Sequence, residues 1–367
     1  MKFKTPTSLI VFFIILAGSM SVMQYWSVPA VDGIRRLLVS SLFLTGLFVG
    51  LWFTLSKIRQ DRSEGLTLTF SYLFLILWAL IILIPTMWMS FMSFKSSGEI
   101  FTNPYGLPQA LTGEKELTQI YQNYISAWKE SKFGQYFLNS IKIVSITVLI
   151  QLFLGSLAAY GLSRFNLKIN KYLLIFFVAS LAIPFQISIF PLFFQYGEIS
   201  KLLTELVTPF YKLIGYKNPI VSLTDTHTGL ILIYLATGLP FTIVILTGFF
   251  KSLPKELYEA AILDGCSEFQ AFWKVMLPLA RPGIITVSIF STIGLYNEYM
   301  TALIFITSDQ LKTVPLGLAQ VSLQAEFRGQ YGLLFSSLMI ASIPTLIFFL
   351  ILQKRITKGM TIGAVKG

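Results

Sequence analysis

The residues that could carry out chemistry are few in this chain. It contains one histidine, His227, and one cysteine, Cys266, among 367 residues. A metal cage or a histidine-dependent triad needs several such groups together, and a disulfide within the chain needs a second cysteine. The sequence therefore predicts no catalytic residue, no metal site and no cofactor bound by this chain.

Two polar residues, Asn297 and Glu298, stand inside an otherwise apolar stretch. Glu298 follows Gly283 at a distance that corresponds to about 22 Å along a helix, which in a membrane span is the outer half of the bilayer. An ionisable group at that depth is costly and normally points into the helix bundle or a wet cavity. With Tyr296 and Tyr299 it would line a translocation path. A hydrogen bond that joins two helices is the alternative, and we favour it.

A charged stretch between two apolar runs, residues 251–283, has the signals of two short helices. Ser252 is the expected N-cap of the first helix, and Pro254 falls in its first turn, where a missing N–H costs little. Gly265 is expected to end this helix, because a residue without a Cβ readily takes the left-handed conformation of a C-terminal cap.

The second helix of this stretch begins with a capping-box pattern. Ser267 and Gln270 have the S-x-x-Q spacing, in which each side chain accepts a backbone N–H of the other residue. Pro278 and Pro282 are expected to stop the helix just before the next apolar run. Such a pair of helices can insert into a groove on another protein. An amphipathic loop that lies on lipid headgroups is the alternative, and spacing alone does not separate the two.

Composition assigns the chain to a membrane. Hydrophobic residues make up 54% of it and charged residues 12%, which is too apolar for an ordinary soluble domain. One helical span needs about 20 apolar residues, so we expect an all-α polytopic bundle with about eight transmembrane helices. The apolar windows are residues 8–26, 37–55, 70–92, 141–162, 172–194, 230–250, 283–306 and 333–352, with Gln151 and Gln186 as further polar residues inside them.

The distribution of charge predicts the orientation. If both termini are cytoplasmic, the inner segments hold 16 of the 28 basic residues but only six acidic ones, as the positive-inside rule requires. The loop 251–282 and the tail 354–367 are then cytoplasmic, and the net charge of +11 reflects topology rather than binding to nucleic acid. Arg35 and Arg36 fall outside and leave the orientation of the first two spans open. The first span could also be a signal peptide.

The stretch "EAAILDGCSEFQAFWKVMLPLARPG" resembles the EAA loop in permease subunits of binding-protein-dependent ABC importers. The residues that match the family pattern are Glu259, Ala260, Ala261, Asp264, Gly265, Leu277 and Pro278. Val275 and Cys266 replace an isoleucine and a small residue that are usual there, and neither change threatens the geometry. The segments "LYNEYMTALIF", "KTVPLGLA" and "KGMTIGAVKG" resemble the carbohydrate branch, the maltose-type second permease, so the resemblance extends over residues 70–367.

The resemblance implies a division of labour. This chain would be half of a pathway for a sugar or oligosaccharide in the prokaryotic inner (cytoplasmic) membrane. Its partners would be a second permease, two ATPase subunits that hold Mg-ATP, and an extracytoplasmic solute-binding protein.

The resemblance also implies how the chain is organised. Its core would be six spans, residues 66–367, and residues 1–65 would add two spans and a linker. The EAA loop would be the coupling helix seated in a cleft of the ATPase. A nucleotide-binding P-loop needs a Gly-Lys pair, which this chain lacks, so we expect a transport subunit and not an enzyme.

Two other classes of protein fit the sequence less well. A secondary transporter driven by protons or sodium is expected to carry several intramembrane acids, whereas Glu298 is the only one well inside a predicted span. A membrane-embedded acyl- or glycosyltransferase needs clustered His, Asp or Cys near one interface, and His227 and Cys266 are predicted on opposite sides.

Overall fold

The computed structural model describes residues 62–113, 118–165, 167–213 and 221–364. In these residues all regular structure is helical, which confirms the predicted all-α class for this part of the chain. Four helices are long and apolar enough to cross a membrane, or up to six if each of two bent pairs counts as one span. The first two predicted spans, residues 8–26 and 37–55, lie outside the described residues. The count of eight and the cytoplasmic termini therefore stay predictions.

The chain divides into two compact units. The first consists of residues 1–127 with 324–339, and the second of residues 128–323 with 340–367. Three helices contribute residues to both units: the short π-helix η1 (Ser126–Glu130), α16 (Val314–Arg328) and α17 (Tyr331–Ala364). The predicted division of the chain at residue 65 stays a prediction.

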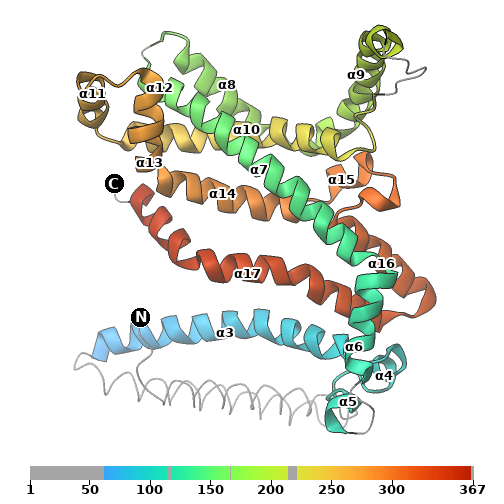
Figure 1. The fold of residues 1–367 in the computed structure, drawn as a ribbon. Coiled ribbons are helices and arrows are strands. Elements are labelled where there is room, and N and C mark those ends of the chain that lie inside the picture. Colours follow the sequence, from blue (N-terminus) through green and yellow to red (C-terminus); the bar gives the residue numbers. More distant parts are fainter. Residues whose placement is uncertain (1–61, 114–117, 166, 214–220, 365–367) are drawn as a thin grey trace. The chain divides into compact units, whose positions relative to one another are not determined.

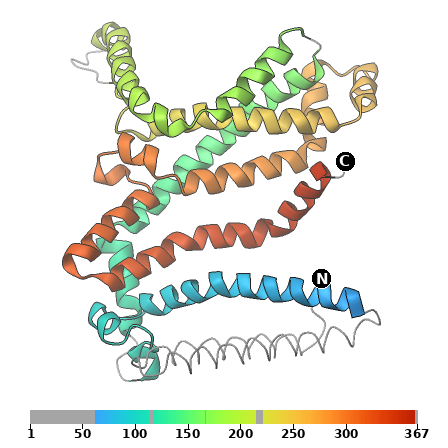
Figure 2. The same cartoon turned by 180° about the vertical axis from the view of Figure 1, so that it is seen from behind.

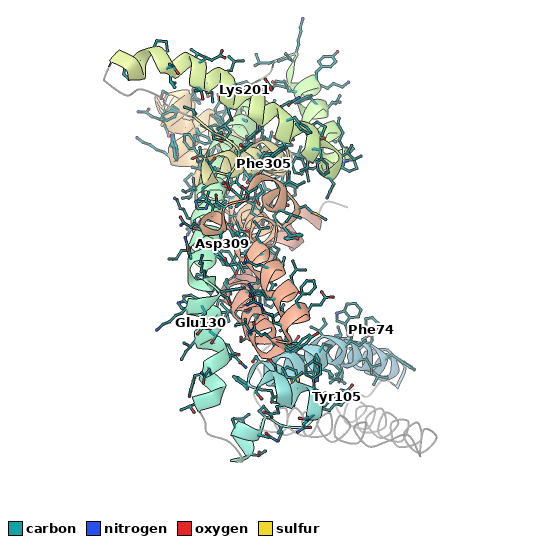
Figure 3. The ribbon with its side chains drawn as sticks, turned by 90° about the vertical axis from the view of Figure 1, so that its right-hand side faces the viewer. Phe74, Tyr105, Glu130, Lys201, Phe305 and Asp309 are labelled. Atoms are coloured by element: carbon teal, nitrogen blue, oxygen red, sulfur yellow. The ribbon has the colours of Figure 1, made fainter. Side chains whose placement is uncertain are left out.

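The first unit contains α3 (Arg62–Ser93) and the short helices α4 (Ser97–Thr102), α5 (Gln109–Thr112) and α6 (Thr118–Ile125). α3 contains the span predicted over residues 70–92, and its Phe74 (Figure 3) is 65% exposed. After α3, the fully buried side chain of Lys95 donates to two carbonyl oxygens of the loop that follows α4, at 2.6 and 2.7 Å. Burial lowers the pKa of Lys95.

The second unit is built around α7 (Phe133–Arg164) and α10 (His227–Ser252), and α14 (Arg281–Tyr296) runs beside both (Figures 1 and 2). α7 and α10 contain the spans predicted over residues 141–162 and 230–250. They approach closely because a glycine stands at the contact: a Cβ on Gly238 would lie 2.8 Å from Nε2 of Gln151. The close contact brings Gln151 within reach of α14 as well.

One predicted span is broken. Instead of one helix over residues 172–194, α8 (Asn170–Ala182) and α9 (Phe185–Leu213) meet at 99°. Proline disfavours helical backbone in the residue before it, and Ile183, which precedes Pro184, is extended with φ −84° and ψ 119°. The predicted span is therefore bent sharply at Pro184, and the pair still qualifies as one bent span.

The span predicted over residues 283–306 is also divided. α14 ends at Tyr296, and α15 (Met300–Phe305) follows after Asn297, Glu298 and Tyr299. The sequence alone suggested that Glu298 lies inside a helix. In the structure it lies in a break between two helices.

Two apolar clusters hold the second unit together at opposite ends of α10. The Phe250 cluster includes Phe272 and Met276, and the Phe305 cluster includes Leu230 and Tyr234 (Figure 3 labels Phe305). Full burial of one large apolar side chain contributes about 1.5–3 kcal/mol. Each cluster therefore anchors a neighbouring segment: the Phe250 cluster holds the charged loop, and the Phe305 cluster holds α15.

The segment between α15 and α16 is held from two sides. It contains the 3₁₀ turn η3 (Asp309–Leu311), and Asp309 (Figure 3) pairs with Lys132 at 2.6 Å, just before α7. Asp225, with φ +54°, accepts the backbone N–H groups of Thr307 and of the next residue, both at 2.9 Å. Burial alone raises the pKa of Asp225, but the hydroxyl of Ser308, which also donates to its carboxylate, and these two backbone hydrogen bonds bring the pKa below its ordinary value.

Candidate coupling loop and transmembrane cavity

The charged stretch after α10 forms a helix and a tight turn at one end of the second unit (Figure 1). α11 spans Lys255–Leu263 with Pro254 at its N-cap. Ser252 does not cap it, so that prediction is wrong. Ser252 is the last residue of α10, and its hydroxyl donates to the carbonyl oxygen of Phe249 at 2.8 Å. The extended backbone of Leu253 and Pro254 separates this serine from the start of α11.

Gly265 ends α11 as predicted. Its φ is +82°, and the N–H groups of Gly265 and Cys266 donate to the carbonyl oxygens of Ile262 and Ala261, both at 3.0 Å. These two bonds satisfy the last carbonyls of the helix at a left-handed glycine cap. The turn is therefore held by backbone geometry that a residue with a Cβ rarely adopts.

The predicted capping box of the next helix is present. Ser267 Oγ accepts the N–H of Gln270 at 3.3 Å, and Gln270 Oε1 accepts the N–H of Ser267 at 3.0 Å. Three helical segments then follow one another and together meet α14 at 73°. They are α12 (Glu268–Ala271), the π-helix η2 (Phe272–Met276) and α13 (Leu277–Leu279). Both Pro278 and Pro282 were expected to stop the helix. The helical run continues through Pro278, so that expectation is wrong for this residue, whereas Pro282 lies in the first turn of α14, just after the run has ended.

The seven motif residues divide by exposure. Ala261 is buried and Leu277 is half-buried against the bundle; the exposed members are Glu259, Ala260, Asp264, Gly265 and Pro278. Beside them, Leu263 is 88% exposed and Phe269 is 64% exposed. Clustered exposed apolar side chains mark interaction surfaces. Sequence reasoning missed Leu263, although it lies four residues after Glu259 and therefore on the same helix face.

Glu268 connects the turn to the end of α7. Its Oε1 accepts the Tyr258 hydroxyl at 2.6 Å, and its Oε2 accepts the Tyr160 hydroxyl at 3.2 Å. Arg164, the last residue of α7, donates from Nη2 to the carbonyl oxygens of Phe250 and of Leu253 at 2.9 and 3.1 Å. The hydrogen bond to Glu268, together with burial, raises the pKa of Tyr258, so this hydroxyl keeps its proton.

Tyr160, Arg164, Tyr258 and Glu268 form what we call the Glu268 network. It joins the ends of α7 and α10 to the two helices of the charged loop. None of its members was predicted from the sequence. A basic residue at the end of a predicted span, such as Arg164, is the signal that could have pointed to it, because the last carbonyls of a helix accept from such side chains.

A cavity of about 360 Å³ lies among α7, α9, α10 and α14, within the second unit. Its polar lining includes Gln151, Gln186, Tyr234, Ser291 and Glu298, and its aromatic lining consists of Phe185, Phe241 and Phe290. Of the four residues predicted for the translocation path, Glu298 lines this cavity, together with Gln151 and Gln186, the further polar residues of the predicted spans.

Glu298 accepts backbone N–H groups from the first turn of α15 and joins this helix to α10. Its Oε2 accepts the Tyr234 hydroxyl at 2.6 Å, and its Oε1 accepts the N–H and the hydroxyl of Thr301 at 2.8 and 2.9 Å. The hydrogen bond between helices that we favoured for this residue is therefore present in the structure.

The other three residues predicted for the path lie outside the cavity lining. Tyr296 is buried and donates its hydroxyl to a carbonyl oxygen of α17 at 3.1 Å. Asn297 is exposed and donates to a carbonyl oxygen of its own helix at 2.9 Å. Tyr299 packs against the Phe305 cluster. The structure thus separates these three side chains from Glu298, although all four are neighbours in sequence.

Comparison with known proteins identifies the family to which the chain is similar. Residues 151–362 match the family described as binding-protein-dependent transport system inner membrane component. The chain is 33% identical to the diacetylchitobiose uptake system permease protein NgcG of Streptomyces coelicolor, over 81% of this chain and 88% of that protein. It is 32% identical to the trehalose/maltose transport system permease protein MalG of Thermococcus litoralis, over 80% of this chain and 94% of that protein.

The fold also has a solved counterpart. A chain in the crystal structure of a bacterial ABC transporter involved in the import of the acidic polysaccharide alginate superimposes with a TM-score of 0.65. The two sequences are 19% identical, and the match covers 80% of this chain and 98% of that one. The charged loop and the cavity both fall inside the segment that matches the family. The chain therefore belongs to the binding-protein-dependent transport system inner membrane components, as a permease of the carbohydrate ABC importer branch.

Proposed function

We propose that this permease carries a sugar or oligosaccharide across a prokaryotic inner membrane, as one half of a pathway that a second permease completes. The substrate class rests on its relatives, which are named for diacetylchitobiose, trehalose and maltose. An external binding protein would deliver the sugar, as the family description implies. A related alginate transporter has been crystallised with a periplasmic protein that holds an alginate pentasaccharide.

The ATPase would be a separate pair of subunits with Mg-ATP, and residues 251–282 would be the contact. The observation that carries this role is the exposed face of α11, where Glu259, Leu263 and Asp264 surround a glycine-capped turn. A short helix with charged and apolar side chains on one face can enter a groove on a partner.

Coupling would depend on the attachment of this loop. Closure of the ATPase dimer would pull on α11, and the Glu268 network would pass the movement to α7 and α10. The pathway would then open to the inside. A partner can shift the equilibrium between the outward-open and inward-open states only through contacts that differ between these two states, and the contact with α11 would be such a contact.

Affinity purification tests the assembly. The tagged chain is recovered from gently solubilised native membranes, and the proteins that stay bound are identified. We expect an ATPase with a P-loop, a second permease and a solute-binding protein, and we expect ATP-dependent uptake of trehalose, maltose or diacetylchitobiose by the reconstituted assembly. Recovery of the chain alone, with residues 251–282 open to protease and solute moved without ATPase, would contradict the proposal and favour a secondary transporter.

A further inference from the structure

We infer that the cavity of the second unit is a transit site for one neutral sugar unit, formed by side chains of this subunit itself. The site presupposes the proposed sugar transport and adds the chemistry that this chain offers to the substrate: two amides, aromatic walls and no cation.

Gln151 supplies an unused acceptor in the cavity lining. Its side chain is 1% exposed, and Nε2 donates toward Gly238 O, Thr242 Oγ1 and Ser291 Oγ at 2.9, 2.6 and 3.0 Å. Oε1 has no hydrogen-bond partner among the described residues. A buried acceptor without a partner is costly. A ligand hydroxyl would satisfy it once the amide turns its oxygen toward the cavity.

Gln186 adds a second amide from α9. Its side chain is exposed and makes no hydrogen bond to the part of the chain that the structure describes. The rings of Phe241 and Phe290 meet edge to face nearby, with centroids 6.4 Å apart. Pockets for small molecules combine aromatic walls with a few placed polar groups. A sugar ring suits this lining, because its hydroxyls can bond to the amides while its C–H face covers the rings.

The charges around the cavity favour a neutral ligand. No lysine or arginine is present among the described residues that line it, and Glu298 is its only ionisable acid. Each oxygen of that carboxylate already accepts two hydrogen bonds. An anionic sugar would lose water without gaining a cation and would lie beside a second negative charge. The cavity is therefore expected to reject a uronate that is otherwise the same size.

Cysteine protection in the assembled transporter tests this site. Cys266 is the only cysteine of the chain, so Cys266→Ala gives a background without thiols in this subunit, and Gln186→Cys then puts one in the cavity lining. Gln195→Cys is the matched control, because Gln195 is exposed on the same helix and does not line the cavity. Both thiols are labelled with a small neutral reagent, alone and with sugar in large excess. The probes are maltose, methyl α-glucoside and methyl α-glucuronide, which differs from the glucoside by a carboxylate.

We expect maltose and the glucoside to slow labelling of Gln186→Cys about tenfold at concentrations ten times above their dissociation constants. They should leave Gln195→Cys unchanged, and the glucuronide should protect neither thiol. Equal labelling of Gln186→Cys with and without the neutral sugars, or equal protection by the glucuronide, would overturn the site.

ATP-driven uptake by the same preparation separates the two levels of inference. An assembly that takes up sugar with ATP but shows no protection contradicts only the cavity site. A chain that binds no ATPase contradicts the proposed function and the cavity site together.

Discussion

At position 265 the backbone conformation favours glycine over any other residue. The φ of Gly265, +82°, lies in the left-handed region, although open space surrounds a Cβ placed there. That conformation costs about 1–2 kcal/mol for a residue with a Cβ. We expect Gly265→Ala to lower the free energy of unfolding by about this amount. Because the bonds that close α11 would weaken, it should also raise the ATP hydrolysed per sugar transported, measured in proteoliposomes.

A glycine in α10 provides the control. An added Cβ on Gly248 also meets nothing within 4 Å, and its φ is not positive. Gly248→Ala should therefore leave stability and coupling unchanged or slightly improved. Full sugar uptake by Gly265→Ala at normal expression and normal ATP consumption would show that the turn does not couple the two subunits.

Among the helices, the Glu268 network decides which ones move with the charged loop. Tyr160→Phe and Tyr258→Phe each remove one hydroxyl donor to Glu268, at about 0.5–1.5 kcal/mol per hydrogen bond. The exposed face of α11 is untouched, so the ATPase should still copurify. With both bonds gone, we expect movement of the loop to reach α7 less efficiently and the ATP consumed per sugar to rise.

The double variant Tyr160→Phe/Tyr258→Phe measures this effect against Tyr172→Phe, which changes a 70% exposed tyrosine of α8. Copurified ATPase reports on assembly, and the ratio of ATP to sugar reports on transmission. An unchanged ratio in the double variant would mean that the network only supports the loop structurally.

For the whole molecule, the segment around Asp309 joins parts of the chain that are 177 residues apart. Hydrogen bonds from Lys132 and then Lys312 hold the pKa of Asp309 below its ordinary value. A carboxylate whose pKa is lower in the folded state stabilises the fold above its unfolded pKa of about 4, and this contribution is lost as the pH falls through the folded pKa.

Melting of the solubilised protein between pH 7 and pH 3 tests this dependence. We expect Asp309→Asn to melt below the wild type at pH 7, with a difference that shrinks below about pH 4. Glu198→Gln is the control: it breaks the pair with Lys201 (Figure 3), where both side chains are more than 70% exposed, and such pairs contribute little. A melting difference for Asp309→Asn that stays constant across this range would contradict the assignment.

Agreement between sequence and structure depends on how local a feature is. The left-handed Gly265 and the capping box of Ser267 were predictable, because their hydrogen bonds join residues within five positions of each other. A kink at Pro184 was predictable, because a proline inside a predicted span is expected to bend the helix, but the size of the bend, 99°, was not. The length of an apolar stretch indicates only that it can span the membrane. Whether neighbouring helices supply partners for the backbone groups that a break leaves without hydrogen bonds depends on tertiary packing. The N-cap at Ser252 failed because α10 extends through that residue.

By itself, the sequence determined the membrane class of the protein, the residues at which the first helix of its charged loop ends and the second begins, and the motif that leads to its family. These depend on composition and on contacts between near neighbours along the chain. Only the tertiary structure decided that Gln151 reaches α14, that Glu298 joins α10 and that Glu268 joins α7. The residues in these contacts are 140, 64 and 108 positions apart. Each helix satisfies its own backbone without them, so the packing of helices alone selects these partners.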